Sequence, residues 1–385
     1  MITRLFACQG SAQLATALAA AAIECDGSRT SDVLVVHDLA SPAAQGQQFF
    51  NVIARAASGL HQWADIVQLP PDGRSRRAMN IVSQALGTAG PSELWLNSFP
   101  TPGSDLLRGL YPAAKRIVYG DGIGVHFTPA YFFPDPPDRF RAACGTVVRW
   151  LRASQSGPMM VPAADRRVDE YRLLLPGLFD EPAPPHVRIE RDAFLPLFET
   201  LGAMPETGID DVVSQLRTAS AAADRVLLLL TSNYSETGRM SRHAEISGYL
   251  NMVREALPTR NTLIVVKPHP RDSLRKINTL TRKVGQSWAV LALNDSRVAH
   301  LPFEAVIARS IRDVPGLRSR LTALCVSSSC LALEYLYGIR CVVGFGDPAA
   351  GGFARRWRRH RMQHEIDLRR ALERIRAGEF GKVCV

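Results

Sequence analysis

The sequence predicts an α/β protein with two Rossmann-like lobes that face one another across a cleft. A chain of 385 residues exceeds one ordinary hydrophobic core, so two domains are expected. Short β-branched runs alternate with helical stretches in both halves, which is typical of βαβ units and a parallel sheet. An irregular, proline-rich joint separates the halves. We place the N-terminal lobe at 1–205 and the C-terminal lobe at 206–385.

The first lobe opens with regular alternation and then becomes irregular. Strands are expected at the β-rich runs 2–8, 32–37, 63–69, 93–97 and 115–119. Helices are expected between them at 11–23, 47–59, 77–86 and 106–111. From about 126 to 200, prolines break the rhythm, and we assign an insertion followed by a linker there.

The second lobe repeats the alternation. Strands are expected at the apolar runs 224–231, 262–267, 288–293, 321–326 and 340–344. Helices are expected at 210–222, 241–256, 272–284, 302–309 and 330–337.

Composition excludes several classes of protein. The hydrophobic content of 46% and charged content of 21% are those of a soluble globular chain. No apolar run reaches the roughly 18–20 residues that cross a bilayer. The seven cysteines are scattered and form no Cys-x-x-Cys pair, which argues against a disulfide framework and a structural zinc site. We expect a reduced, cytoplasmic protein.

The net charge of +10 is concentrated near the C-terminus, where a predicted helix carries Arg355, Arg356, Arg358, Arg359 and Arg361. Such a basic helix favours peripheral contact with the inner face of the cytoplasmic membrane or with a polyanion. A solvated helix face is the simpler alternative. Because no nucleic-acid-binding motif accompanies the charge, nucleic acid is not an expected partner.

The first candidate site is Gly120-Asp121-Gly122, which follows a predicted strand, with Gly124 close behind. These glycines permit a sharp turn with positive φ and shape the loop around the carboxylate. A carboxylate in that position suits a general base that takes a proton from an acceptor hydroxyl. An ordinary Asp-Gly turn is the structural alternative.

The second candidate site is Lys267-Pro268-His269-Pro270, at the end of a β-branched run. The two prolines restrict the backbone on both sides of His269 and end the strand. A rigidly held imidazole could then donate to a departing phosphate, and Lys267 would add positive charge. A purely structural loop is the alternative.

The third candidate site is the serine run Ser327, Ser328 and Ser329, immediately before a predicted helix. Three hydroxyls, the free N–H groups and the helix dipole together suit an anion, although serines also cap helices. Ser232 and Asn233 follow the first strand of the second lobe and are further candidates for donor binding. Glu304 could accept hydrogen bonds from ribose hydroxyls, or simply favour the dipole of its helix.

The order of these motifs resembles that of the bacterial sialyltransferases, especially the polysialyltransferase-like families. Those families share an acidic-Asp-Gly motif, a His-Pro motif and a Ser/Thr motif in this order. The resemblance implies a GT-B glycosyltransferase, a CMP-activated donor, inversion at the anomeric carbon and no metal or other cofactor. No Asp-x-Asp pair follows a strand of the second lobe, which also argues against a metal-held diphosphate donor.

Carried onto this chain, the resemblance implies a role for each motif. Asp121 would be the general base, and His269 would contact and protonate the CMP phosphate. Ser327–Ser329 would hold that phosphate, while Glu304 would bind the cytidine ribose. Gly120 departs from the pattern, because many relatives carry a first acidic residue there, so the base would be Asp121 alone.

The resulting prediction is a transferase that moves sialic acid or a related nonulosonic acid to a hydroxyl of a surface glycan or glycolipid. Three alternatives stay open. One is a CMP-Kdo-type transferase with the same fold, and another is a GT-B enzyme that uses a nucleotide-diphosphate sugar. The third is a polyanion- or nucleic-acid-binding protein, which would show steep salt dependence and indifference to nucleotides.

Overall fold

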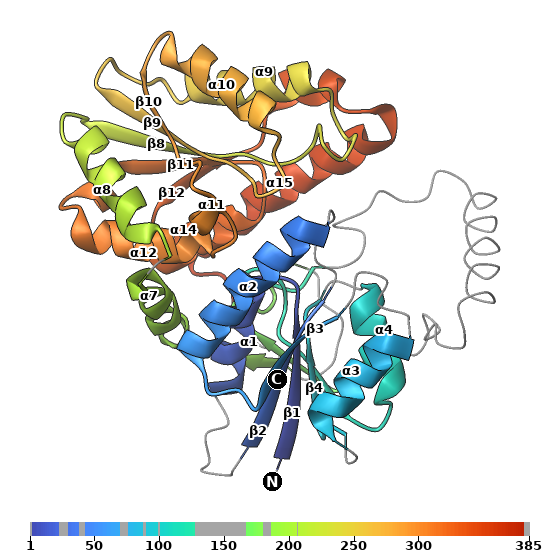
Figure 1. Ribbon diagram of the computed structural model, residues 1–385. Helices are drawn as coiled ribbons and strands as arrows, with labels where there is room; N and C mark the ends of the chain where they lie inside the picture. Colours follow the sequence, from blue (N-terminus) through green and yellow to red (C-terminus); the bar gives the residue numbers. More distant parts are fainter. Residues whose placement is uncertain are drawn as a thin grey trace. The chain divides into compact units, whose positions relative to one another are not determined.

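The computed structural model describes residues 2–22, 30–37, 43–69, 76–87, 90–98, 101–127, 167–179, 186–205 and 207–380. The chain divides into two compact units, Met1–Leu197 and Phe198–Phe380, where the sequence analysis placed the division between 205 and 206. Each unit holds one parallel sheet with helices packed on it (Figure 1). The predicted fold class, α/β with two Rossmann-like lobes, is therefore confirmed.

The first unit is built on a parallel sheet in the order β3-β2-β1-β4-β5-β6-β7. Its strands are β1 (Ile2–Cys8), β2 (Thr30–Val36), β3 (Asp65–Gln68), β4 (Glu93–Leu96), β5 (Lys115–Val118), β6 (Glu170–Leu173) and β7 (His186–Arg188). The strand order reverses between β1 and β4. In open α/β sheets, ligands bind outside the carboxyl ends of the strands at such a switch point.

Helices cover both faces of this sheet (Figure 1). They are α1 (Ser11–Ala21), α2 (Ala43–Leu60), α3 (Arg76–Leu86) and α4 (Pro102–Leu110), and the 3₁₀ turn η3 (Arg191–Ala193) and α7 (Leu195–Ala203) follow β7. Side chains of α3 and α4 join those of the central strands in one buried cluster, which includes Val82, Leu107, Leu5 and Leu94. Burial of this apolar surface stabilises the unit.

Strands β6 and β7 lie within the segment 126–200, where the sequence analysis predicted no strand. They extend the sheet in parallel beyond β5, with Ile117 opposite Glu170 and Tyr171 opposite His186. Strands of four and three residues are too short to show a clear period in the sequence. Most of the predicted insertion, 128–166 and 180–185, lies outside the described residues.

The second unit contains a smaller parallel sheet in the order β10-β9-β8-β11-β12. Its strands are β8 (Arg225–Leu230), β9 (Thr262–Lys267), β10 (Ala289–Ala292), β11 (Leu321–Cys325) and β12 (Arg340–Val343). Here the order reverses between β8 and β11. The central strand β8 is buried over Val226–Leu230, as expected for a strand covered on both faces.

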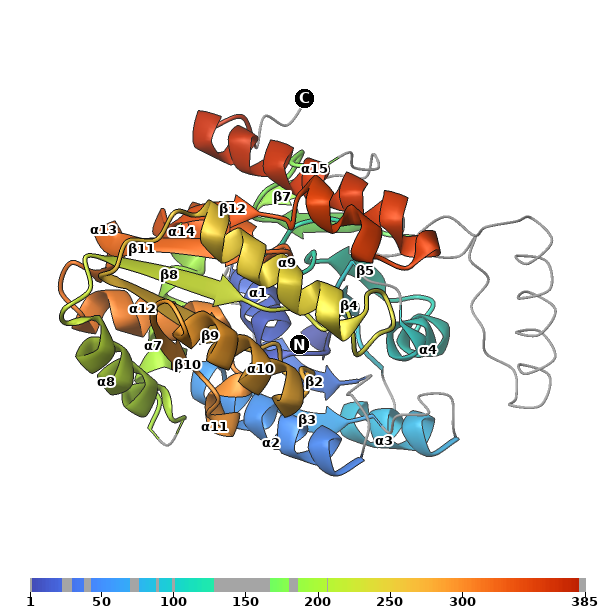
Figure 2. The same cartoon turned by 90° about the horizontal axis from the view of Figure 1, so that it is seen from above.

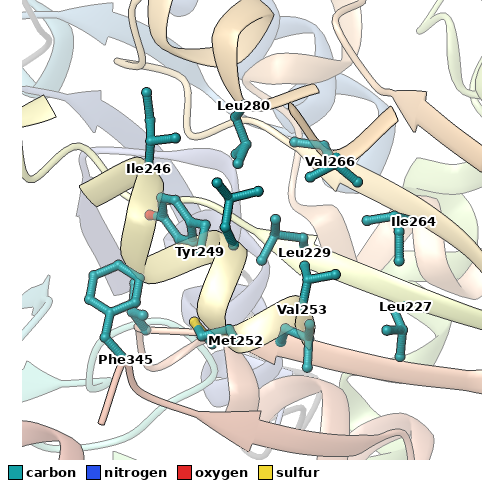
Figure 3. Close-up of a cluster of buried hydrophobic side chains, with 14 of the residues drawn as sticks. Leu227, Leu229, Ile246, Tyr249, Met252, Val253, Ile264, Val266, Leu280 and Phe345 are labelled. Atoms are coloured by element: carbon teal, nitrogen blue, oxygen red, sulfur yellow. The ribbon is translucent and has the colours of Figure 1, made fainter. Parts of the chain in front are cut away.

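The helices of this unit are α8 (Ile209–Ser220), α9 (Arg242–Glu255), α10 (Leu274–Gly285), α11 (Ser296–Ala299), α12 (Phe303–Asp313), α13 (Leu317–Arg320), α14 (Ser329–Tyr337) and α15 (Arg355–Ala377), with the 3₁₀ segment η4 (Asp347–Gly352) before α15. Helices α9 and α10 cover one face of the sheet (Figures 1 and 2). Their apolar side chains meet β8 and β9 in a core that includes Tyr249, Leu280, Leu229, Ile264 and Phe345 (Figure 3).

Helix α15 is amphipathic, and its buried face includes Trp357, Arg361, Glu365 and Leu368. This spacing of three to four residues is that of one helix face. Among the described residues, no helix has the length and apolarity needed to cross a membrane.

Candidate functional site

The Gly-Asp-Gly segment forms a tight turn at the carboxyl end of β5. Gly120, Gly122 and Gly124 all have positive φ, at 82°, 56° and 78°. The Asp121 N–H donates to the Val125 carbonyl at 2.8 Å, and the Val125 N–H returns a bond to the Asp121 carbonyl at 3.1 Å. A Cβ at Gly120 would lie 2.7 Å from the Gly124 carbonyl carbon, so glycine alone fits there without rearrangement.

A chain of amides orients the Asp121 carboxylate. Asn97 Nδ2 donates to Gln9 Oε1 at 3.2 Å, and the Gln9 N–H donates to Gln13 Oε1 at 2.7 Å. Gln13 must therefore present its Nε2, which donates to Asp121 Oδ1 at 3.0 Å. Burial raises the pKa of Asp121, while the hydrogen bonds from Gln13 and from the Gly122 backbone oppose that rise. The result is an oriented carboxylate with raised basicity, which suits a general base.

In the second unit, three neighbouring strands end at the same edge of the sheet. Residue pairing places Leu230 of β8 beside Lys267 of β9, and Leu229 of β8 beside Leu324 of β11. The loops that follow these strands carry the predicted donor-binding residues: Ser232, Asn233, Lys267, Pro268, His269, Pro270, Ser327, Ser328 and Ser329. They therefore share the edge that holds the topological switch point.

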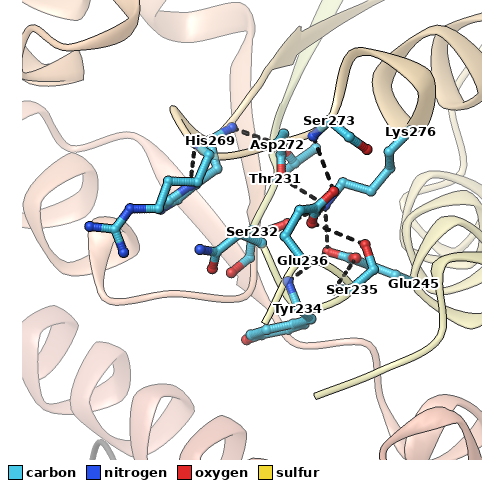
Figure 4. Close-up of polar contacts among 12 residues, drawn as sticks. Thr231, Ser232, Tyr234, Ser235, Glu236, Glu245, His269, Asp272, Ser273 and Lys276 are labelled. Carbon is cyan, nitrogen blue, oxygen red and sulfur yellow. Dashed lines mark hydrogen bonds and ion pairs between the residues drawn. The ribbon is translucent and has the colours of Figure 1, made fainter. Parts of the chain in front are cut away.

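The backbone of the His-Pro motif fixes the imidazole of His269 (Figure 4). The ring Nδ1 accepts the Arg271 backbone N–H at 3.0 Å. The backbone N–H of His269 donates to Thr231 Oγ1 at 3.0 Å and to Asp272 Oδ2 at 2.9 Å. Burial and the charges of Lys267 and Arg271 lower the pKa of His269 to about 3. The neutral ring therefore carries its proton on Nε2 and presents it as a hydrogen-bond donor.

Charged and aromatic groups gather near the end of β9. Burial lowers the pKa of Lys267 to about 8, although the charges of Glu304 and Asp272 oppose that shift. Burial also raises the pKa of Glu304, which lies in the first turn of α12 and is 9% exposed. Lys267 Nζ lies 5.8 Å from the ring centroid of Phe303. A partly desolvated ammonium of this kind interacts strongly with an anion.

The serine run does not cap α14 with its side chains. Ser328 occupies the N-cap position, but its side chain makes no capping hydrogen bond. Ser327 Oγ donates to Ser329 Oγ at 3.3 Å. The first two serines are half-buried and Ser329 is exposed. The hydroxyls therefore remain next to the positive end of a nine-residue helix, which is an arrangement suited to an anion.

A buried ionic network anchors the loops after β8 and β9 (Figure 4). Lys276 Nζ of α10 lies 2.7 Å from Asp272 Oδ1, 2.8 Å from Glu236 Oε2 and 3.1 Å from Glu245 Oε1. It also donates to the Ser232 carbonyl at 2.7 Å. Although burial opposes its charge, the hydrogen bonds that Lys276 donates to Asp272 and Glu236 raise its pKa. This network connects the backbone of Ser232 to Asp272, and Asp272 holds His269.

Gln13, Asp272 and Lys276 orient the candidate groups, and none of them was predicted from the sequence. A lysine on the apolar face of the predicted helix 272–284 was the available signal, because a buried ammonium needs carboxylate partners. The contacts of Gln13 with Asp121 join segments 108 residues apart, and no spacing rule predicts them.

The prediction that all five arginines of the basic helix contact a membrane surface is wrong for Arg361, because its side chain is buried. Arg355, Arg356, Arg358 and Arg359 are exposed, whereas Arg361 is 5% exposed. Helical periodicity places Arg361 one turn after the buried Trp357, on the inward face of α15. Membrane contact through the four exposed arginines stays a prediction.

Part of the second unit is similar to a known protein family. Residues 200–339 match the model of the alpha-2,8-polysialyltransferase family. The match spans the His-Pro motif, Glu304 and the serine run, whereas Asp121 and α15 lie outside it. It confirms the resemblance to sialyltransferases over this stretch and supports the predicted enzyme class, a glycosyltransferase.

The solved structures that match the chain share little sequence with it. A UDP-N-acetylglucosamine 2-epimerase has 10% identity and a TM-score of 0.42, with coverage of 97% of this chain and 90% of its own. WaaG, a glycosyltransferase involved in lipopolysaccharide biosynthesis, has 12% identity and a TM-score of 0.34, with coverage of 98% and 95%. A glycosyltransferase from Rickettsia africae has 10% identity and a TM-score of 0.41, with coverage of 98% of both chains. A search of the curated proteins found no match.

Proposed function

We propose that the protein is an inverting, metal-independent glycosyltransferase that moves a sialic acid or related nonulosonic acid from a CMP-activated donor to a glycan hydroxyl. The fixed Nε2–H of His269 carries this proposal, since it offers an uncharged donor at the sheet edge that also holds the serine run and the start of α14. The family match over 200–339 supports the donor class.

The donor phosphate would bind at the carboxyl edge of the second sheet. His269 Nε2–H, the hydroxyls of Ser327–Ser329 and the N-terminus of α14 would donate hydrogen bonds to it, and Lys267 would supply positive charge. Because a CMP donor carries a single phosphate, these groups can stabilise the leaving group without a divalent cation. Glu304 would accept hydrogen bonds from the cytidine ribose.

The reaction would be one direct displacement. Asp121 takes the proton of the acceptor hydroxyl, and the hydroxyl oxygen forms a bond to the anomeric carbon. The bond from that carbon to the phosphate oxygen breaks, and its electron pair leaves with CMP. Since the pKa of His269 is far below 7, the neutral ring would stabilise the departing phosphate by hydrogen bonding and would not protonate it.

Thermal stability in the presence of CMP, CDP, UDP or GDP, with EDTA or with Mg²⁺, tests this proposal. A ligand that binds only the folded protein stabilises it, by about 2.7 kcal/mol at 100 times its Kd. We expect CMP to stabilise the wild type equally with EDTA and with Mg²⁺. His269→Ala should lose most of the shift, while His243→Ala, an exposed histidine at the start of α9, should keep it. Preference for UDP or GDP would overturn the proposed donor.

A further inference from the structure

Arg361 lies on the buried face of the basic helix α15, among side chains that form its packing surface. Its side chain is 5% exposed, and Leu368, farther along the same face, is 0% exposed. A buried guanidinium costs free energy unless hydrogen bonds or an opposite charge compensate it. Among the residues that the structure describes, the compensation comes from hydrogen bonds to a hydroxyl and a carbonyl, not from an ion pair.

Those contacts converge on the carbonyl that precedes the serine run. Arg361 Nη2 donates to the Val326 carbonyl at 3.1 Å and also to the hydroxyl of Tyr234. The Tyr234 hydroxyl in turn donates to the same Val326 carbonyl at 2.9 Å. The guanidinium carbon lies 4.7 Å from the ring centroid of Tyr234, within the range of a cation–π contact. Two donors thus hold the peptide that joins Val326 to Ser327.

These hydrogen bonds to the Val326 carbonyl lie just before α14, whose N-terminus has no side-chain cap. Because no serine side chain caps the helix, capping does not determine the conformation of the segment 326–329. Tyr234 belongs to the loop after β8, and Val326 follows β11, so the contact bridges the two strands that flank the switch point. Arg361 ties this bridge to α15.

Two other charged groups, Arg239 and Glu365, lie near Arg361. Arg239 is a like charge near Arg361. Burial lowers the pKa of Arg239, and the charge of Arg361 lowers it further. Glu365, one turn along α15, accepts the N–H groups of Phe345 at 3.0 Å and Gly346 at 3.2 Å. Glu245 forms an ion pair with Lys276 at 3.1 Å. The carboxylates of Glu365 and Glu245 therefore have hydrogen-bond or ion-pair partners other than Arg361.

We infer that Arg361 is a positioning residue for the donor phosphate, a role that rests on the proposed function. It acts through the Val326 carbonyl, which it holds so that Ser327–Ser329 and the start of α14 face the phosphate, and its charge favours the bound anion. Tyr234 completes the arrangement by holding the same carbonyl.

Titration calorimetry with CMP and UDP on wild type, Arg361→Met, Arg361→Lys and Tyr234→Phe tests the inference, with urea unfolding of each variant as the measure of stability. Arg359→Met, an exposed arginine on the same helix, is the matched control. We expect CMP to bind Arg361→Met roughly tenfold or more weakly, since hydrogen bonds to charged groups exceed the 1.4 kcal/mol that equals tenfold. Arg361→Lys retains the charge and should lose less affinity for CMP than Arg361→Met.

Tyr234→Phe keeps the ring and the fold while it removes one donor, and we expect an intermediate loss of CMP affinity. Equal CMP affinity in wild type and all three folded variants would show that Arg361 only packs the helix, and would overturn the inference. If wild type binds UDP instead, the proposed donor is wrong, and the same comparison with UDP decides the role of Arg361. A wild type that binds neither nucleotide overturns both.

Discussion

At the scale of single residues, environment decides what each candidate group can do. Asp121 is a carboxylate whose pKa is raised by burial and whose orientation is fixed by Gln13. His269 is held neutral, with one ring nitrogen occupied by a backbone N–H. From the sequence alone, a histidine or an aspartate is compatible with several chemical roles. In the proposed reaction, these surroundings would make Asp121 a base and His269 a hydrogen-bond donor.

Asp121→Asn should abolish proton removal and leave donor binding intact. The amide keeps the shape and can still accept from Gln13, but it cannot take a proton. We expect the transfer rate, measured as CMP release, to fall by a factor of about 10²–10⁴. The affinity for CMP, measured by calorimetry, should not change. Asp192→Asn, an exposed aspartate of the same unit, should leave both unchanged.

In wild type the transfer rate should fall as the pH drops through the raised pKa of Asp121, because the base must be deprotonated.

The pKa of Lys267 predicts a pH dependence of CMP affinity. Its folded-state value of about 8 lies below the usual 10.5, so the ammonium is intact at pH 7 and is lost as the pH rises through about 8. Affinity for CMP should therefore be full near pH 7 and about tenfold lower at pH 9, in calorimetric titrations at both values. Lys267→Arg stays charged and should show little change. An equal fall in this variant would exclude Lys267 as the cause.

At the scale of elements, the buried network of Lys276 holds two loops against α9 and α10. Lys276→Met would leave Asp272, Glu245 and Glu236 without their shared cation. Removal of one partner from a buried ion pair typically costs 3–5 kcal/mol. We expect a loss of that order in the free energy of unfolding, measured in urea. Arg275→Met, an exposed neighbour on α10, should change it by less than about 0.5 kcal/mol.

A Lys276→Met variant as stable as wild type would contradict this account of the network. It would show that the three carboxylates become protonated or hydrated without cost, and that His269 does not depend on them for its position.

The elements differ in how well the sequence predicts them. Strands such as β8 and β9 are long apolar runs that end at polar residues, so both the strands and the motifs after them could be predicted. Helix α10 begins at Leu274 and not at 272, because Asp272 and Ser273 hydrogen-bond outside the helix. Strands β6 and β7 had no readable pattern. Contacts such as Arg361 with Val326 depend on tertiary packing, which periodicity constrains only to a helix face.

At the scale of the whole molecule, each unit carries one part of the proposed chemistry. The first unit orients the general base, and the second unit collects the groups that suit a phosphate. The net charge of +10 is only partly a surface property, because Arg361 is buried. The exposed arginines at the start of α15 remain available for an anionic surface.

Calorimetric titration of CMP and of cytidine into wild type and His269→Asn tests the central claim most directly. The two ligands differ only in the phosphate. In wild type we predict that CMP binds at least tenfold more tightly than cytidine. His269→Asn should reduce CMP affinity by about tenfold and leave cytidine affinity unchanged, since each 1.4 kcal/mol is a factor of ten. Equal binding of the two ligands to wild type, or an equal loss of both in the variant, would contradict a phosphate site built around His269.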